Sequence, residues 1–156
     1  CGDGQQKAGM SYEYREGYLY LAIYGQKKVI IRPHFAMKPV FYEANSLVRE
    51  NSRQMSLVCG PLVYCLEEVD NGAQQHMLYA SPEAVEQAET YTLPFLGREA
   101  VGYQFAGFRK KANTVSDPLY HKAEREEYQP VTLKWIPYFA WANREEGEMR
   151  VWIYKK

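Results

Sequence analysis

The sequence predicts an all-β fold, a jelly-roll-like antiparallel β-sandwich with at most one short helix. Tyrosine is abundant, with 14 residues, and together with valine, isoleucine, phenylalanine and tryptophan it suits a pleated, half-buried surface better than a helix. Short apolar runs alternate with turn-forming residues along most of the chain. The runs are not separated by the regular helices that join parallel strands, which favours antiparallel pairing.

Apolar runs in the first part of the chain predict several short strands. The first run begins at Tyr18, and a turn at Gly25 separates it from a second run that ends before Pro33. Gly60 and Pro61 separate two later runs and predict a bend, because proline cannot donate a hydrogen bond to a central ladder. We expect these strands at residues 18–24, 29–32, 40–43, 54–59 and 62–66.

The second part of the chain predicts one helix, one long loop and two further strands. Residues 81–88 predict the helix, because Ser81 suits an N-cap and Pro82 suits the first helical position. Residues 107–130 are polar and dense in charge, which is typical of an irregular loop. Alternating residues at 131–136 and 148–154 then predict a hairpin-like pair that closes a sheet.

Length and composition predict one domain over residues 1–156. A chain of 156 residues with 46% hydrophobic residues can bury about two-thirds of its unfolded surface, which is enough for one core. The chain begins with Cys1 rather than methionine, and we interpret it as a C-terminal fragment of a longer polypeptide. A processed lipoprotein with a lipid on Cys1 is the alternative.

The charge pattern argues against polyanionic partners. The 19 basic and 19 acidic residues cancel, and neither sign forms a run that would attract nucleic acid or an anionic membrane surface. No apolar stretch approaches the ~20 residues that span a bilayer. We therefore expect neither nucleic acid nor a membrane span.

Candidate catalytic and metal-binding residues do not form a recognisable pattern. Cys59 and Cys65 are flanked by apolar residues and predict buried free thiols, and the three histidines lie far apart without a ligand spacing. Glu67 and Glu68 are adjacent, so a strand would point them to opposite faces, and with Asp70 we interpret them as a solvated strand end. We therefore predict no catalytic residue, no metal ligand and no cofactor within this chain.

Aromatic residues near the C-terminal end offer a second kind of site. Exposed aromatic rings stack on the apolar faces of sugars, although burial in the core is the default expectation for such residues. Trp141 and the polar residues after it stand just before a turn and are the strongest candidates for a role beyond packing. The sugar-binding alternative rests on Trp135, Tyr138, Trp141, Asn143 and Arg144.

Three segments, residues 60–67, 136–144 and 147–152, resemble the C-terminal region of glycoside hydrolase family 127, the β-L-arabinofuranosidase family. Their order and spacing agree with it, and residues 17–48 resemble what precedes them there. Cys59 is a departure, because the family often has arginine before the Gly-Pro pair; this weakens a sugar-binding role at that position. The consecutive cysteine pair of the family matches nothing in this chain.

The resemblance implies a β-sandwich appended to a catalytic (α/α)6 barrel that this chain lacks. The catalytic glutamate, the cysteine nucleophile and its zinc would then lie in the barrel. The expected function is a non-catalytic accessory domain whose partner is the barrel of the same polypeptide. The alternative is an independent carbohydrate-binding module, and an autonomous enzyme ranks third. Homo-oligomerisation and the compartment, cytoplasm or periplasm, stay open at this point.

Two structural features should separate these readings. An accessory domain should expose apolar surface that a partner domain covers. Burial of Trp135, Tyr138 and Trp141 against the opposite sheet would favour a scaffold, whereas coplanar exposed rings would favour sugar binding.

Overall fold

The structure is a computed structural model that describes residues 10–25, 28–114, 116–123 and 125–156. Its contacts divide the chain into two compact units, Cys1–Ala36 and Met37–Lys156, whereas the sequence predicts one domain. The sandwich therefore begins at Met37. Cys1, and with it the lipoprotein alternative, lies outside the described residues.

The first unit contains a β-hairpin. Strand β1 (Met10–Arg15) pairs antiparallel with β2 (Tyr18–Ile23), with Arg15 opposite Tyr18. Glu16 and Gly17 both have positive φ, 52° and 83°, the conformation of a type I′ turn, whose twist matches that of the two strands. The strand predicted at residues 29–32 is wrong, because this segment has no regular structure and β2 pairs with β1 instead.

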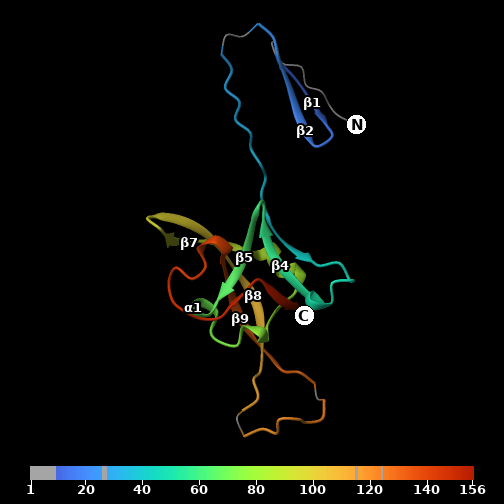
Figure 1. Ribbon diagram of the computed structural model, residues 1–156, viewed down its shortest axis with the longest axis vertical. Helices are drawn as coiled ribbons and strands as arrows, with labels where there is room; N and C mark the ends of the chain where they lie inside the picture. Colours follow the sequence, from blue (N-terminus) through green and yellow to red (C-terminus); the bar gives the residue numbers. More distant parts are fainter. Residues whose placement is uncertain (1–9, 26–27, 115, 124) are drawn as a thin grey trace. The chain divides into compact units, whose positions relative to one another are not determined.

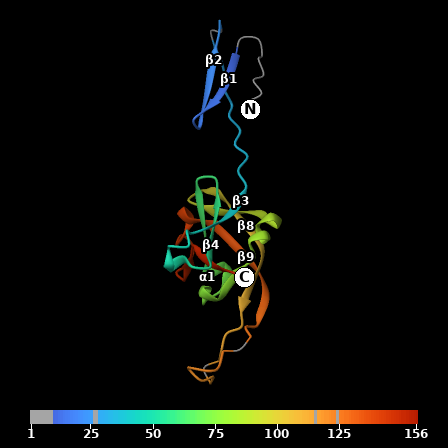
Figure 2. The same cartoon turned by 90° about the vertical axis from the view of Figure 1, so that its right-hand side faces the viewer.

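The second unit is the sandwich (Figures 1 and 2), and its nine strands form one sheet that closes on itself. Hydrogen bonding runs from β5 through β9, β8, β6, β11 and β4, and β4 pairs again with β5 to complete a ring. β3, β7 and β10 attach to β4, β8 and β5. The strands are β3 (Pro39–Glu43), β4 (Gln54–Cys59), β5 (Leu62–Glu67), β6 (Leu78–Ala80), β7 (Glu89–Phe95), β8 (Arg98–Lys110), β9 (Tyr128–Pro137), β10 (Met149–Arg150) and β11 (Trp152–Lys155).

The all-β prediction is confirmed, with two corrections to the pairing. The segments at 131–136 and 148–154 do not form a hairpin, because β9 pairs with β5 and β8, while β11 pairs with β4 and β6. The β6–β11 pair is parallel rather than antiparallel. The predicted loop is shorter than expected, since β8 extends to Lys110 and β9 begins at Tyr128.

Helical structure among the described residues is limited to short turns. The predicted helix forms as the 3-10 helix η3 (Pro82–Gln87), and the Ser81 side chain makes no capping hydrogen bond. The one α-helix in this part of the chain is a single turn, α1 (Glu68–Asn71), where the sequence predicts a strand end. Three further 3-10 turns are η1 (Arg49–Asn51), η2 (Gln75–Met77) and η4 (Tyr138–Ala140). No helix among the described residues is long and apolar enough to cross a membrane.

Two apolar clusters hold the sandwich together. The larger one draws side chains from every strand of the ring, with Trp135 fully buried at its centre. The smaller one contains Cys65, Ile136 and Ala140. Because Tyr64 and Leu66 belong to the larger cluster and Cys65 to the smaller, the smaller cluster lies on the opposite face of β5. This second cluster places η4 against the sheet.

Candidate functional site

The residues after η4 are fixed to the sandwich by an ion-pair cluster. Glu67, at the end of β5, is 4% exposed, and its carboxylate accepts hydrogen bonds from Arg144 Nη2 at 2.5 Å and Nε at 3.2 Å. Arg144 Nη2 also donates to Asp70 at 2.5 Å, and the Ala142 backbone N–H donates to Glu67 at 2.8 Å. One arginine thus connects the loop to both β5 and α1.

The burial of Glu67 corrects the solvated strand end that the sequence predicts. Its negative charge is compensated by Arg144 rather than by water, as a buried carboxylate requires. Hydrogen bonds to two carboxylates raise the pKa of the Arg144 guanidinium. The bond to Asp70 has the larger effect, and the bond to Glu67 adds to it. The guanidinium therefore stays charged, and the cluster is a structural clamp.

The polar residues predicted to contact sugar have partners within the protein. The Asn143 amide donates to the backbone oxygens of Ala140 at 3.1 Å and Trp141 at 2.8 Å, which holds the turn after η4. Arg144 binds Glu67 and Asp70. Both side chains shape the loop from within.

Trp135 must be removed from the predicted sugar-contacting residues. Its side chain is fully buried, stacked on Phe105 at a centroid distance of 6.0 Å and edge-on to Phe41 at 5.9 Å. No ligand on the surface can touch this ring. Trp135 is a packing residue, which was the default expectation for an aromatic side chain.

Tyr138 and Trp141, by contrast, stand at the surface. Their rings are stacked at a centroid distance of 6.0 Å and an angle of 29°, and the two side chains are 46% and 41% exposed. The neighbouring Phe139 is half exposed and meets Phe95 edge-on at 5.2 Å. η4 therefore brings aromatic residues from two segments together.

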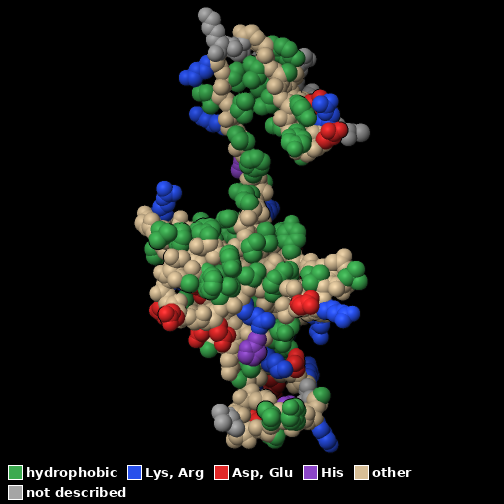
Figure 3. All heavy atoms as spheres, in the orientation of Figure 1, with side chains coloured by type: hydrophobic (Ala, Val, Ile, Leu, Met, Phe, Trp, Pro, Cys, Tyr) green, Lys and Arg blue, Asp and Glu red, His purple; other side chains and the backbone are tan. Residues whose placement is uncertain are grey.

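A strained leucine extends this aromatic group. Leu96 and Gly97 form the two-residue turn between β7 and β8, with φ of 44° and 74°. Left-handed backbone is unfavourable for a bulky residue, and Leu96 is also 80% exposed. We call these five residues the η4 surface: Phe95, Leu96, Tyr138, Phe139 and Trp141. Figure 3 shows hydrophobic side chains gathered over the end of the sandwich where Figure 1 labels β7 and β5.

The cysteines of the sandwich are buried and free, as predicted. Burial, and secondarily the negative charge of Glu67, raises the pKa of the Cys65 thiol to about 12. Cys59 lies 3.3 Å from the Tyr103 hydroxyl. Because a nucleophilic cysteine needs a low pKa and access to solvent, Cys65 is inert. The described residues also hold no group of three or more His, Cys, Asp and Glu side chains suited to a metal ion.

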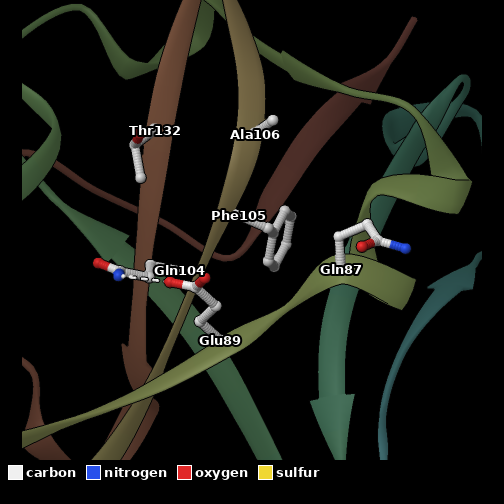
Figure 4. Close-up of a pocket in the computed structure, with 6 residues that line it drawn as sticks. All are labelled: Gln87, Glu89, Gln104, Phe105, Ala106 and Thr132. Atoms are coloured by element: carbon white, nitrogen blue, oxygen red, sulfur yellow. Dashed lines mark hydrogen bonds between the residues drawn. The ribbon is translucent and has the colours of Figure 1, made fainter.

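A shallow depression beside β8 offers no catalytic arrangement (Figure 4). Its volume is about 260 Å³, smaller than typical ligand pockets. Gln104 donates to Glu89 at 3.2 Å across it, and Glu89 is its one carboxylate among the described residues, whereas glycoside hydrolysis uses two. The lining residues are Gln87, Glu89, Gln104, Phe105, Ala106 and Thr132.

Sequence reasoning missed several members of this site. Glu67 and Asp70 were noticed as acids but not as partners of Arg144, which lies 77 positions beyond Glu67. Leu96 carried a usable signal, because a Leu-Gly pair between two apolar runs places a bulky residue in a tight turn. Phe139 carried no such signal, because nothing in its sequence context distinguishes it from an ordinary core aromatic residue.

Comparisons with known proteins agree with this architecture. The curated non-reducing end beta-L-arabinofuranosidase of Bifidobacterium longum subsp. longum is 34% identical over 139 residues, which are 87% of this chain and 21% of that protein. A solved GH127 beta-L-arabinofuranosidase from Geobacillus stearothermophilus T6 is 32% identical, with a TM-score of 0.77, over 92% of this chain and 22% of that one. A second solved structure, a glycoside hydrolase, has a TM-score of 0.74 at 24% identity over 99% of this chain and 26% of that one.

The chain thus spans about a fifth of the length of the arabinofuranosidases that it matches. The family profile that matches it covers residues 39–154, which is nearly the whole second unit. On this evidence the chain belongs to glycoside hydrolase family 127, and residues 39–154 form its C-terminal domain.

Proposed function

We propose that this domain is a non-catalytic accessory module that packs through the η4 surface on the catalytic barrel of the same polypeptide. The barrel, with its catalytic glutamate and zinc-bound cysteine, would carry the hydrolysis of β-L-arabinofuranosides. About four-fifths of the length of the matching relatives lies outside this chain, which leaves room for such a partner. The domain would supply a docking face.

The conformation of Leu96 carries this proposal. A leucine at φ 44° costs backbone free energy, and 80% exposure of its side chain leaves apolar surface in water. Neither cost is offset within the sandwich. Both are explained if Leu96 enters an apolar recess of a partner domain, because side-chain burial there would compensate the turn strain.

The test is the substitution Leu96→Asn, which should have opposite effects on the stability of the isolated chain and of the protein that includes the barrel. Leu96→Asn replaces the turn residue with one that tolerates left-handed backbone, and Asn-Gly is the preferred type I′ pair. In the isolated chain we expect a higher midpoint of thermal unfolding. In the same chain extended upstream to include the barrel, we expect a lower midpoint and slower hydrolysis of an aryl β-L-arabinofuranoside.

Leu119→Asn is the matched control, because Leu119 is 88% exposed and lies in the loop after β8, at the other end of that strand from Leu96 (Figure 1). This substitution should change neither the unfolding midpoint of the two proteins nor the rate of hydrolysis by the extended one. Stabilisation of both proteins by Leu96→Asn would contradict docking through this surface.

Sugar binding at the same surface is the second candidate, and one observation favours it. The exposed Tyr138 and Trp141 rings are stacked with their planes 29° from parallel, and exposed aromatic faces can stack on the apolar face of a sugar. Titration calorimetry of the chain with arabinose oligosaccharides tests this candidate. Heat that Trp141→Ala abolishes would support a carbohydrate-binding module, whereas absence of heat would leave docking as the function of the rings.

A second copy of the chain is a further occupant to test. Sedimentation equilibrium of the isolated chain would reveal a dimer. Loss of that dimer in Phe139→Ser would assign the η4 surface to homo-oligomerisation instead of barrel docking.

A further inference from the structure

The hairpin of the first unit is apolar on one face, where Tyr12 and Tyr14 of β1 lie opposite Leu21 and Leu19 of β2. Its other face is mixed, because Glu13 and Arg15 of β1 lie on it. β2 reads Tyr-Leu-Tyr-Leu-Ala-Ile without a polar residue, and successive side chains of a strand point to opposite faces. Tyr18 is 70% exposed on one face and Leu19 is 54% exposed on the other. An uninterrupted apolar strand is typical of a position covered on both sides in a larger sheet.

The first unit has no core of its own among its described residues. The sheet consists of two strands, and an isolated two-stranded hairpin is marginally stable in water. The segment that follows, residues 28–36, has no regular structure. It exposes Ile30 by 68%, Ile31 by 51% and Phe35 by 73%.

The same segment is where sequence and structure disagree most. Val29, Ile30 and Ile31 are the residue types that favour strands, yet they pair with nothing in the described part of the chain. Strand formation needs a neighbouring edge, and β1 already occupies one edge of β2. A missing partner strand explains the extended segment, and a missing apolar layer explains the uncovered apolar face of the hairpin.

Two boundaries coincide between the units. The compact sandwich starts at Met37, and the family's C-terminal domain starts at residue 39. The solved glycoside hydrolase nevertheless covers 99% of this chain, so its fold includes counterparts of residues before 39. Those residues are thus part of the parent fold but not of the C-terminal domain.

We propose that residues 10–36 are strands of a second sheet, completed by polypeptide that lies upstream in the full-length protein. β2 and the segment 29–35 would hydrogen-bond to upstream strands, and apolar side chains from another layer of the parent fold would cover the apolar face of the hairpin. The C-terminal domain would then be joined to its neighbour by shared strands as well as by the η4 surface. This inference uses different residues from the proposed docking surface and goes beyond it.

Amide hydrogen exchange of the isolated chain and of the upstream-extended protein tests the inference. In the extended protein we expect the amides of residues 18–23 and 29–35 to exchange on the order of 100-fold more slowly than in the isolated chain. Amides of β4 and β5 provide the internal control and should be equally protected in both. Equal exchange of residues 18–35 in the two proteins would overturn the inference.

Substitutions separate shared strands from other coverings. In the extended protein, Leu19→Asp and Ile31→Asp should each speed exchange across residues 18–35 by at least about tenfold, whereas the control Leu47→Asp, at a site 86% exposed in the sandwich, should not. In the isolated chain neither should change the unfolding of the sandwich. Protection of residues 18–35 that rises with concentration in the isolated chain would assign the covering to a second copy and overturn the inference.

The two proposals can be contradicted independently of each other. Leu96→Asn should leave the exchange of residues 18–35 unchanged in the extended protein, since Leu96 belongs to the sandwich. If Leu96→Asn has no effect while residues 18–35 are protected, docking through the η4 surface is contradicted and the shared sheet is supported.

Discussion

Arg144 binds the buried carboxylate of Glu67 across 77 sequence positions, with its Nε 3.2 Å and its Nη2 2.5 Å from the same oxygen. The second carboxylate oxygen of Glu67 accepts the Ala142 backbone N–H at 2.8 Å. One carboxylate therefore fixes both the backbone and the side chain of the loop that follows η4. The clamp thus holds the backbone directly after Trp141.

Removal of Arg144 should destabilise the sandwich strongly. Arg144→Ala leaves Glu67 and Asp70 without their cation, and breaking a buried ion pair costs about 3 kcal/mol or more. We expect a fall of that size in the free energy of unfolding, measured by urea denaturation. Arg49→Ala, at an exposed residue of η1, should change it by less than ~0.5 kcal/mol.

A double-mutant cycle tests whether the loss comes from the pair. Glu67→Gln combined with Arg144→Ala should cost less than the sum of the two single changes, because the uncompensated buried charge is then gone. Additive costs would mean that the two side chains act independently.

Stability should fall at alkaline pH. Burial raises the pKa of Cys65 from 9.0 to about 12 and that of Tyr64 from 10.0 to about 12. The unfolded chain releases these protons at lower pH than the folded chain, so folding is weakened as pH rises from about 9 to about 12. Urea denaturation from pH 8 upward should show the decline.

The same series on Cys65→Ala provides the comparison. This variant lacks the Cys65 thiol, so its stability should fall less steeply over that range. An equally steep decline would show that Cys65 does not contribute.

Trp135 should matter for stability and not for ligand contact. Trp135→Ala empties the centre of the core, and such truncations cost about 3–5 kcal/mol. Trp135→Phe keeps an aromatic ring between Phe41 and Phe105 and should cost clearly less. If sugar binding is detected, Trp135→Phe should leave the affinity unchanged in calorimetry, whereas Trp141→Ala should abolish it.

Replacement of Gly102 by any larger residue should destabilise the sandwich. A Cβ at this position would lie 2.5 Å from the Tyr91 ring and 2.8 Å from the backbone oxygen of Trp135. Gly102→Ala must displace backbone in the β8–β9 pair, and overpacking of this kind costs about 1–3 kcal/mol. Ala106→Ser, at an exposed position of the same strand, is the control, and a thermal melt in which both variants match the parent chain would contradict the close approach.

Local sequence patterns predicted the strands whose formation depends mainly on their own residues and on an adjacent turn. β4 and β5 are apolar runs on either side of Gly60, and the bend predicted between them forms as the turn of a hairpin. β7 was missed because its register is set by β8, through pairs such as Leu93 with Ala100, and not by its own composition. Residues 29–32 show the reverse case, in which strong local preference lacks the partner that a strand requires.

The site shows the same division. The exposure of Tyr138 and the burial of Trp135 could not be told apart from sequence, because both are aromatic residues near one strand end. Their difference follows from pairing: Trp135 lies opposite Leu66 and Tyr103 inside the ring, whereas Tyr138 begins η4 after β9 has ended. Long-range partners, which no window of sequence contains, decide which ring meets solvent.

The closed ring also has a consequence for how the domain is made. β11, at residues 152–155, is the strand that bridges β4 and β6, and it follows every other strand of the ring in sequence, so the circle of hydrogen bonds stays broken until these residues have been added. Until β11 joins them, β4 and β6 each have unpaired residues along one edge, and β11 closes the ring between them. The addition of β11, rather than the formation of any single hairpin, is the step at which this ring of strands can close.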